Sequence, residues 1–215
     1  MPAITLDSVT QSLSRHAGLY RRRRPVYQTV MLTSLSRLWQ EHHARVLDVG
    51  GGTGVMAQAI QELLPAGRVC AVDVVDRYFE TLSVDTRVYD GACLPFADGS
   101  FEAATINNVM HHVPVAMRGE VMREVRRVVT GPVYIKDHVA ASWLDHRRLA
   151  ILDAIGNIPF GGQIDADYLS QAEWERLALD AGYRIAARTG GEYRKGPMAW
   201  LFPNQLETTM RFEPA

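Results

Sequence analysis

The fold of this chain is decided by the stretch VLDVGGGTG, residues 46–54. Apolar residues lead into a loop in which four of five positions are glycine, and the run 55–60 that follows can continue as a helix. A strand, a tight turn and a helix start in this order let the backbone approach a ligand closely, because glycine has no Cβ. The stretch therefore predicts a ligand-binding loop at the carboxyl end of a buried strand.

Two well-known glycine-rich patterns fit this loop poorly. A Walker phosphate loop continues with Lys and then Ser or Thr, and no lysine follows Gly54. The dinucleotide fingerprint expects its third Gly or Ala at Val55, where valine is a poor substitute. The spacing reads instead as Asp48-x-Gly50-x-Gly52-x-Gly54.

An acidic residue follows the loop at a distance that favours an adenosine ligand. The apolar run 69–72 predicts a second buried strand, and Asp73 ends it, 23 positions after Gly50. In a βαβ unit, an acidic residue about 20 residues on accepts hydrogen bonds from ribose hydroxyls. A strand-end Asp can also simply cap the next turn. Asp73 alone therefore does not decide which adenosine cofactor binds.

Two further segments complete a pattern in order: YDGACLPFADGSFE, residues 89–102, and AATINNVMHHVP, residues 103–114. Together with the loop they resemble the motifs of class I methyltransferases that use S-adenosylmethionine. Gly91 after Asp90 and Glu102 in place of Asp are departures from the usual pattern. In that family the acidic residue after the third strand accepts a hydrogen bond from the adenine amino group, and the resemblance assigns this role to Asp90. A carboxylate suits the role, because it only accepts hydrogen bonds and the amino group only donates them.

The resemblance implies a doubly wound α/β fold, with a mostly parallel seven-stranded sheet, helices on both faces and an antiparallel last strand. The alternation of apolar strands with helical stretches favours the same class, and we expect the last strand near 198–202. The resemblance also implies S-adenosylmethionine as cofactor, bound by Tyr27, Asp48, Gly50, Gly52, Gly54, Asp73, Val74, Asp90, Gly91 and Asn107. Two alternatives are a cofactor-binding protein of this fold without methyl transfer and, more remotely, an NAD-linked oxidoreductase.

The expected organisation is one domain. Residues 1–44 form an N-terminal helical lid, 45–138 the cofactor-binding core, 139–170 a substrate-side insertion, and 171–215 the completion of the sheet. Ser142 to Ile155 reads as a helix, 156–162 as a hinge-like loop, and 170–173 as a capping box. The helix is expected to carry an apolar stripe, with Leu144, Leu149, Leu152 and Ile155 on or near one side.

Candidate catalytic residues follow the fourth and fifth strands, where an open α/β sheet places its ligands. His111 and His112 come after the fourth strand, and Asp137 and His138 end the fifth. A histidine can take the proton of a hydroxyl acceptor, since its pKa lies near operating pH. We predict His138, His112 and Asp137 as catalytic, with an Asp137–His138 dyad as one arrangement. The alternative for each histidine is packing or orienting the cofactor loop.

Composition narrows the function class. The formal net charge of −1 suggests no bulk attraction to nucleic acid, although Arg21–Arg24 is either a solvated turn, a substrate contact or a nucleic-acid contact. The two cysteines show no metal-ligand spacing, so no metal site is expected. Neither a secretory leader nor an apolar run of membrane-spanning length is visible. We therefore expect a cytoplasmic enzyme that methylates a small molecule at an oxygen atom. The sequence indicates no oligomeric state.

Overall fold

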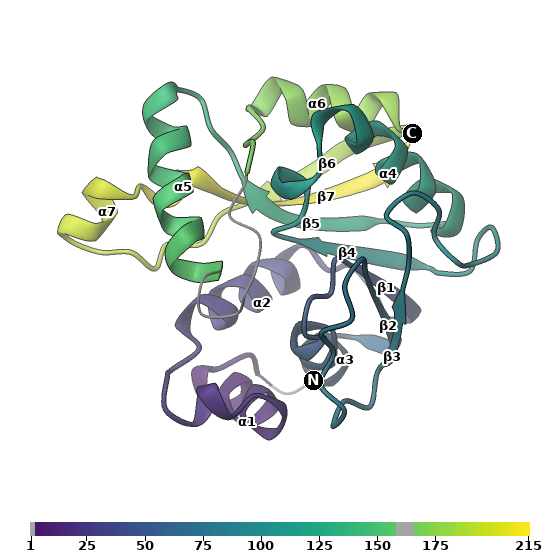
Figure 1. The fold of residues 1–215 in the computed structure, drawn as a ribbon, viewed down its shortest axis with the longest axis horizontal. Coiled ribbons are helices and arrows are strands. Elements are labelled where there is room, and N and C mark those ends of the chain that lie inside the picture. Colours follow the sequence, from purple (N-terminus) through teal and green to yellow (C-terminus); the bar gives the residue numbers. More distant parts are fainter. Residues whose placement is uncertain (1–2, 158–165) are drawn as a thin grey trace.

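A seven-stranded sheet forms the centre of the computed structural model, which describes residues 3–157 and 166–215 (Figure 1). The strand order is β3-β2-β1-β4-β5-β7-β6, and β7 runs antiparallel to both of its neighbours while the other pairs are parallel. The strands are β1 His43–Val49, β2 Ala66–Asp73, β3 Asp85–Val88, β4 Ala103–Asn107, β5 Val133–His138, β6 Tyr183–Thr189 and β7 Glu207–Pro214. The predicted doubly wound α/β fold is confirmed.

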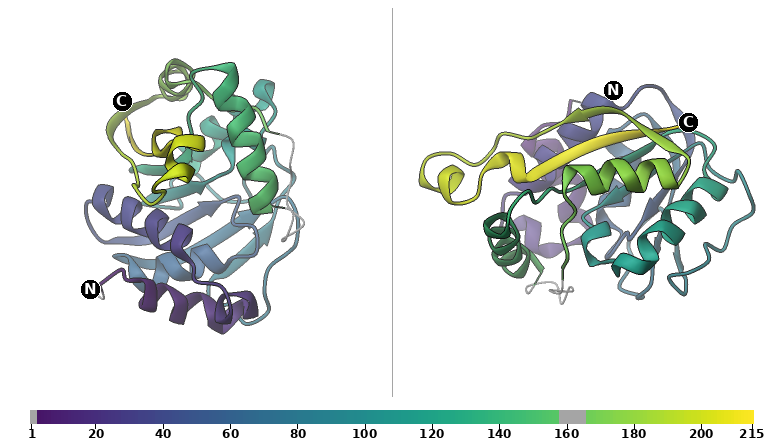
Figure 2. Two further views of the ribbon diagram at one scale, coloured as in Figure 1. Left: turned by 90° about the vertical axis from the view of Figure 1, so that its left-hand side faces the viewer. Right: turned by 90° about the horizontal axis from the view of Figure 1, so that it is seen from above.

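Helices cover both faces of this sheet. In Figures 1 and 2, α1 to α3 lie on one side and α4 and α6 on the other, while α5 and α7 stand beyond the end of β5. The helices are α1 Leu6–His16, α2 Val26–Leu38, α3 Val55–Leu63, α4 Val115–Val128, α5 Trp143–Asn157, α6 Gln171–Asp180 and α7 Pro197–Leu201, with short 3-10 turns at η1 Gly18–Arg21, η2 Met110–His112 and η4 Asn204–Leu206. No helix within the described ranges is long and apolar enough to cross a membrane.

Alternation along the strands creates two hydrophobic cores. In β1, Val46 joins the core under α1 to α3, whereas Leu47 joins the core under α4 and α6. In β5, Tyr134 faces the first core and Ile135 the second. Because this strand is buried on both faces, the polar residues that end it are carried into the interior.

The N-terminal segment is packed, not loose. Val9 and Leu13 of α1 are fully buried in the same core as Ile60 of α3. Arg21–Arg24, by contrast, is exposed throughout. A role of residues 1–44 as a lid remains a prediction, and the packing makes the stretch around Tyr20 and Tyr27 the part best placed for it.

Two local predictions need correction. Residues 198–202 do not form the last strand: Pro197 begins the short helix α7 there, a position proline favours, and the strand is β7. Trp200 is 77% exposed, so this apolar run does not enter the core. The apolar stripe expected on α5 is broken, because Leu149 is buried but Leu144 and Ile155 are exposed.

The C-terminal elements follow their local signals more closely. Ser170 and Glu173 form the predicted capping box at the start of α6, and Gly182 adopts φ +75° beyond its end. Helix α5 continues through Gly156 and Asn157, where a loop was expected. The rest of the predicted hinge, 158–162, lies outside the described residues.

Candidate functional site

The glycine loop connects β1 to α3 with three residues in the left-handed backbone region. Gly50, Gly52 and Gly54 have φ of +71°, +58° and +79°. A Cβ on Gly50 would overlap the side chain of Val109, which follows β4. A Cβ on Gly52, by contrast, would meet no atom within 4 Å. A Cβ on Gly54 would overlap the side chain of Leu82. The loop is therefore packed at both ends and open to a ligand in the middle.

Asp73 lies against this open part of the loop, as the spacing predicted. Its side chain is buried, and Oδ2 accepts a hydrogen bond of 2.8 Å from the backbone N–H of Gly52. The next residue, Val74, is 54% exposed, and its side chain lies beside Gly91, where a Cβ would stand 3.2 Å from Val74 Cγ1. The carboxyl ends of β2 and β3 thus bring together three of the predicted cofactor residues.

Asp90 is exposed and structures its own turn. Its Oδ1 accepts from the backbone N–H groups of Ala92 and Cys93, both at 2.9 Å. The hydrogen bonds from Cys93 and Ala92 lower the pKa of this carboxyl. Asp90 is therefore held as an ionised acceptor at the surface, on the Val74 side of the loop.

A second carboxylate, Asp48, lies beneath the loop and is almost completely buried. Its Oδ1 accepts from Thr105 Oγ1 at 2.6 Å and from Asn107 Nδ2 at 3.2 Å. Burial raises the pKa of Asp48 to about 6, and no Lys or Arg of the described chain forms an ion pair with it. Asn107 Oδ1 is also buried and has no hydrogen-bond partner among the described residues. The two acceptors together suit a ligand that brings positive charge.

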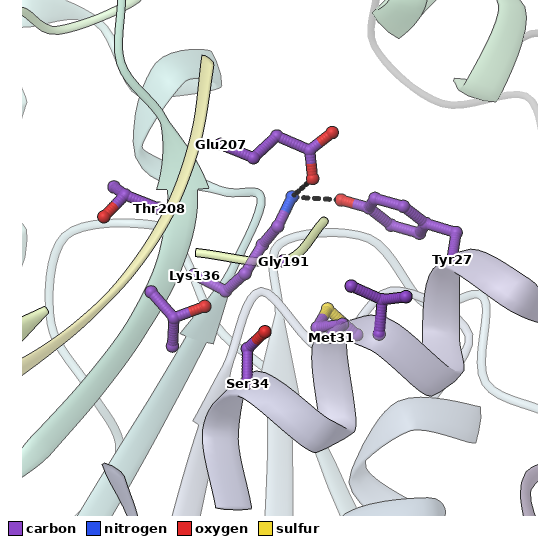
Figure 3. Close-up of a pocket in the computed structure, with 9 residues that line it drawn as sticks. Tyr27, Met31, Ser34, Lys136, Gly191, Glu207 and Thr208 are labelled. Carbon is purple, nitrogen blue, oxygen red and sulfur yellow. Dashed lines mark hydrogen bonds and ion pairs between the residues drawn. The ribbon is translucent and has the colours of Figure 1, made fainter. Parts of the chain in front are cut away.

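Lys136 and Glu207 form a buried network that the sequence did not predict (Figure 3). Lys136 Nζ lies 2.9 Å from Glu207 Oε2, and both side chains are nearly inaccessible. The same ammonium group contacts the hydroxyl of Tyr27 and donates to Asn108 Oδ1 at 2.8 Å. Glu207 also pairs with Arg194. Tyr27, predicted to touch the cofactor, is thereby placed at the carboxyl ends of β4 and β5.

Asn108 marks this junction as strained. With φ of +56°, it is the one non-glycine residue of the described chain in the left-handed region. Its amide accepts from Lys136 and donates to Tyr27 at 2.8 Å, which offsets the backbone cost. Such strain is typical of functional sites, and here it lies beside Asn107 and the loop.

The predicted catalytic residues lie in a second buried group, which we call the histidine cluster. Its members are His111, His112, Asp137, His138, Asp153 and Tyr168. Asp137 is fully buried and accepts from the backbone N–H groups of Met110 at 3.0 Å and His138 at 2.7 Å. These bonds fix its carboxylate between η2 and the end of β5.

The predicted side-chain hydrogen bond between Asp137 and His138 does not form, and Asp137 pairs with His111 instead. His138 Nδ1 lies 3.6 Å from Asp137 Oδ1, too far for a hydrogen bond, and the ring that donates to Asp137 is that of His111. Consecutive side chains of a strand point to opposite faces, so neighbours in sequence are poorly placed to pair. The tertiary contact with η2 supplies the histidine instead.

Local electrostatics separate the two histidines. Burial lowers the pKa of His111, but the Asp137 and Asp153 carboxylates outweigh it and raise the pKa to about 9. Burial, together with the nearby Lys136 charge, lowers the pKa of His138 to about 4. At neutral pH the first ring is therefore charged between two carboxylates, and the second is neutral, with a buried Nδ1 that has no hydrogen-bond partner among the described residues.

Asp153 and Tyr168 were not predicted as site residues, and both come from the segment 139–170. Asp153 Oδ2 lies 3.3 Å from His112 Nε2 and 3.6 Å from His111 Nε2. The Tyr168 ring stacks on His111 with centroids 5.2 Å apart. The position of Asp153, one helical turn after the buried Leu149 on α5, was the available signal.

Comparisons with known proteins agree with this arrangement. A family model for the methyltransferase domain matches residues 46–131, which run from β1 to the turn before β5. A flavonoid 4'-O-methyltransferase of Glycine max is 26% identical over 161 residues, covering 67% of this chain and 43% of that protein. This chain therefore spans less than half the length of that curated relative.

Solved structures share the fold across nearly the whole chain. A possible histamine N-methyltransferase from Thermotoga maritima has a TM-score of 0.66 at 17% identity, covering 95% of this chain and 99% of that one. A magnesium protoporphyrin IX methyltransferase from Synechocystis, with bound SAH, has a TM-score of 0.61 at 13% identity, covering 93% and 88%. Residues 46–131 thus match the methyltransferase domain, and nearly the whole chain shares the fold of S-adenosylmethionine-dependent methyltransferases.

Proposed function

We propose that this protein transfers a methyl group from S-adenosylmethionine to an oxygen atom of a small molecule. The observation that carries the proposal is the Asp73 carboxylate, which accepts from Gly52 N–H at the open middle of the glycine loop. An acidic side chain fixed at that point fits the ribose hydroxyls of an adenosine ligand. The curated proteins that match the chain are O-methyltransferases, which supports oxygen as the acceptor.

The remaining cofactor residues divide by the chemistry they offer. Val74 and Gly91 give an apolar edge beside the Asp90 carboxylate, which suits an adenine ring and its amino group. At the other end of the loop, Asp48 and the free acceptor Asn107 Oδ1 suit the cationic methionine end. Tyr27 donates a hydrogen bond to Asn108, between the proposed methionine end of the cofactor site and the end of β5.

The acceptor is placed at the carboxyl ends of β4 and β5. When bound, S-adenosylmethionine supplies a methyl group already activated on a sulfonium, so the protein mainly orients the acceptor oxygen for in-line attack. His138 is neutral and lies at the strand end. Its pKa of about 4 makes it a weak base, so its imidazole would take the hydroxyl proton only as methyl transfer makes the acceptor oxygen acidic. Asp137 and His112 position this region through their contacts with His111 and Asp153.

Binding and transfer are tested separately. Calorimetry should show binding of S-adenosylmethionine and S-adenosylhomocysteine, but no comparable binding of NAD. Incubation with cofactor labelled in its methyl group and a metabolite extract should then label a small molecule, whose methoxy group mass spectrometry can identify. Tight NAD binding with no response to either sulfur ligand would contradict the assignment. Cofactor binding without label transfer would favour a protein of this fold that has lost methyl transfer.

The N-terminal segment is proposed to close over the bound ligands. Tyr20 and Tyr27 flank the exposed Arg21–Arg24 run, and Tyr27 already reaches Asn108 beside the loop. Hydrogen exchange with and without cofactor should show increased protection in residues 18–30 and little change in α1, which is packed in the core. Equal protection of residues 18–30 in both states would count against a ligand-ordered lid.

A further inference from the structure

The histidine cluster contains buried polar atoms that lie close to one another but make no hydrogen bond of normal geometry within the described chain. His111 Nε2, Asp153 Oδ2 and the Tyr168 hydroxyl are all buried and lack a hydrogen-bond partner among residues 3–157 and 166–215. Their residues are 1%, 8% and 2% exposed. Buried polar groups in proteins are nearly always paired, so a convergence of unsatisfied atoms indicates a missing ligand.

The spacing of these atoms matches the edge of a metal coordination tetrahedron. His112 Nε2 lies 3.3 Å and His111 Nε2 3.6 Å from Asp153 Oδ2, and one donor atom from each of the three residues lies within 4.8 Å of the others. With zinc bonds of about 2.0–2.1 Å, the ligand atoms of a tetrahedron stand about 3.3–3.4 Å apart. The three side chains are therefore already near bonding positions.

Asp137 supplies the support that a metal-binding histidine requires. It accepts from the Nδ1–H of His111, which turns Nε2 toward Asp153 and His112. A carboxylate on the far nitrogen of a ligating histidine fixes the tautomer and orients the ring. Asp137 is held in turn by the backbone N–H groups of Met110 and His138.

We propose that His111 Nε2, His112 Nε2 and a carboxylate oxygen of Asp153 bind a divalent transition metal ion, with Asp137 as the supporting carboxylate. The ion would displace to solvent the proton that His111 Nε2 carries in the metal-free protein. Two imidazoles and one carboxylate favour zinc or a similar ion over magnesium or calcium, which prefer oxygen ligands. Three protein ligands leave a fourth position for an oxygen ligand, the arrangement typical of catalytic sites.

A second grouping, His111 with Asp137 and His138, is also compact enough for an ion. It is the weaker choice because Asp137 already accepts three hydrogen bonds, although His138 Nδ1 has no hydrogen-bond partner among the described residues. Asp137 accepts from two backbone N–H groups, and its remaining contact is the hydrogen bond from His111. A metal there would displace the bonds that fix η2 to β5, whereas two atoms of the Asp153 grouping, His111 Nε2 and Asp153 Oδ2, make no hydrogen bond within the described residues.

The site is close to the predicted reaction centre. Val109, two residues before His111, packs against Gly50 of the cofactor loop. If the proposed methyl transfer holds, a metal ion would lower the pKa of an acceptor hydroxyl in the fourth position, so that its proton passes more readily to His138. Metal binding is measured without any methyl acceptor, so its outcome is independent of the proposed function.

The test is titration of the chelator-treated full-length protein with Co²⁺, followed by competition with Zn²⁺. We expect one equivalent to bind, with the intense visible absorption of a four- or five-coordinate cobalt site, and Zn²⁺ to displace it. Asp153→Asn and His112→Ala should each weaken binding more than 100-fold. Asp137→Asn should weaken it by about 10–100-fold, the range for an outer-shell partner.

His42→Ala is the matched control, because His42 is exposed and distant in sequence from the cluster. It should bind cobalt as the unmodified protein does. Circular dichroism checks the fold of each variant, and the isosteric Asp153→Asn decides the matter if His112→Ala does not fold. No saturable binding, or binding equally strong in folded Asp153→Asn, would overturn the proposal and leave the cluster as a His111 cation held between two aspartates.

Discussion

The glycine loop and the histidine cluster lie at the same end of the sheet but are built in different ways. The loop is one continuous segment, Asp48 to Gly54, completed by Asp73 at the end of the adjacent strand. The histidine cluster draws its members from η2, β5, α5 and the stretch before α6. The loop therefore depends on local backbone geometry, whereas the cluster depends on how distant elements pack.

Charge also distinguishes the two regions. Under the loop, Asp48 is buried with neutral hydrogen-bond donors and no cation. In the histidine cluster, two carboxylates enclose a histidine, and both Asp137 and Asp153 keep their pKa values below the usual range despite burial, because His111 lies between them. Asp48 under the loop therefore has no positively charged partner until a ligand binds, whereas the histidine cluster already contains the His111 cation.

The largest expected effect is that of His138→Ala, which should separate turnover from cofactor binding. His138→Ala should lower turnover by about 10²–10⁴, the usual contribution of a general base, while cofactor affinity stays nearly unchanged. The reason is position, since His138 ends β5 and the adenosine half of the site lies at β1 to β3. Single-turnover rates and calorimetry on the same preparation would check both parts.

His112→Ala serves as the comparison on the β4 side of the same region. A larger loss in that variant would place the proton acceptor on η2. Unchanged turnover in both variants would mean that the acceptor needs no protein base, as for an amine or an oxygen that is already ionised.

The next effect concerns stability and the second buried network. Glu207→Gln should lower the free energy of unfolding by about 3–5 kcal/mol, because Lys136 and Arg194 then remain buried without their shared carboxylate. Urea unfolding measures it. Glu175→Gln is the control, since Glu175, whose side chain is 52% exposed, pairs with Arg188, and such surface pairs contribute about 0–1 kcal/mol. Equal losses in the two variants would show that the buried network adds no specific stability.

The fold and the cofactor half could be predicted from sequence because their signals are local. Gly50, Gly52 and Gly54 report a backbone that needs positive φ, and the apolar run before Asp73 reports a buried strand. The last strand was misplaced for a related reason. Residues 198–202 are apolar enough for a strand, but Pro197 starts a helix there, and β7 at 207–214 alternates with polar residues that hide it.

The acceptor half was predicted only in part, because its partners are fixed by tertiary packing. Asp137 was expected to hold His138, yet the contact that forms is with His111, which η2 brings across from β4. Asp153 lies 42 residues after His111, and no spacing rule connects them. Lys136 is buried through an ion pair with Glu207 on an antiparallel neighbour, a contact that depends on the strand order.

A smaller effect tests the cofactor half directly. Asp73→Ala should weaken S-adenosylmethionine binding by about tenfold or more, and by more than Asp90→Ala does. Asp73 would lose contacts to two ribose hydroxyls and its hydrogen bond to Gly52 N–H, whereas Asp90 would lose one amine contact. Calorimetry on the two variants gives the order. An unchanged dissociation constant for Asp73→Ala would mean that the ribose lies elsewhere.

The smallest effect is a dependence of cofactor affinity on pH that originates at Asp48. Burial raises the pKa of Asp48 to about 6 in the free protein, so the carboxyl is largely protonated at pH 5 and ionised at pH 8. A cationic ligand nearby favours the ionised form and lowers this pKa, so binding at low pH must release a proton.

Affinity for S-adenosylmethionine should therefore fall as the pH drops below 6, and be about tenfold weaker at pH 5 than at pH 8. Asp48→Asn keeps a side-chain oxygen for Thr105 and Asn107 but cannot titrate, so its affinity should be nearly constant over that range. Calorimetry in buffers of different ionisation enthalpy would also detect the released proton in the unmodified protein and none in the variant. An equal pH dependence in both proteins would assign the titration to another group and remove the cationic end of the cofactor from Asp48.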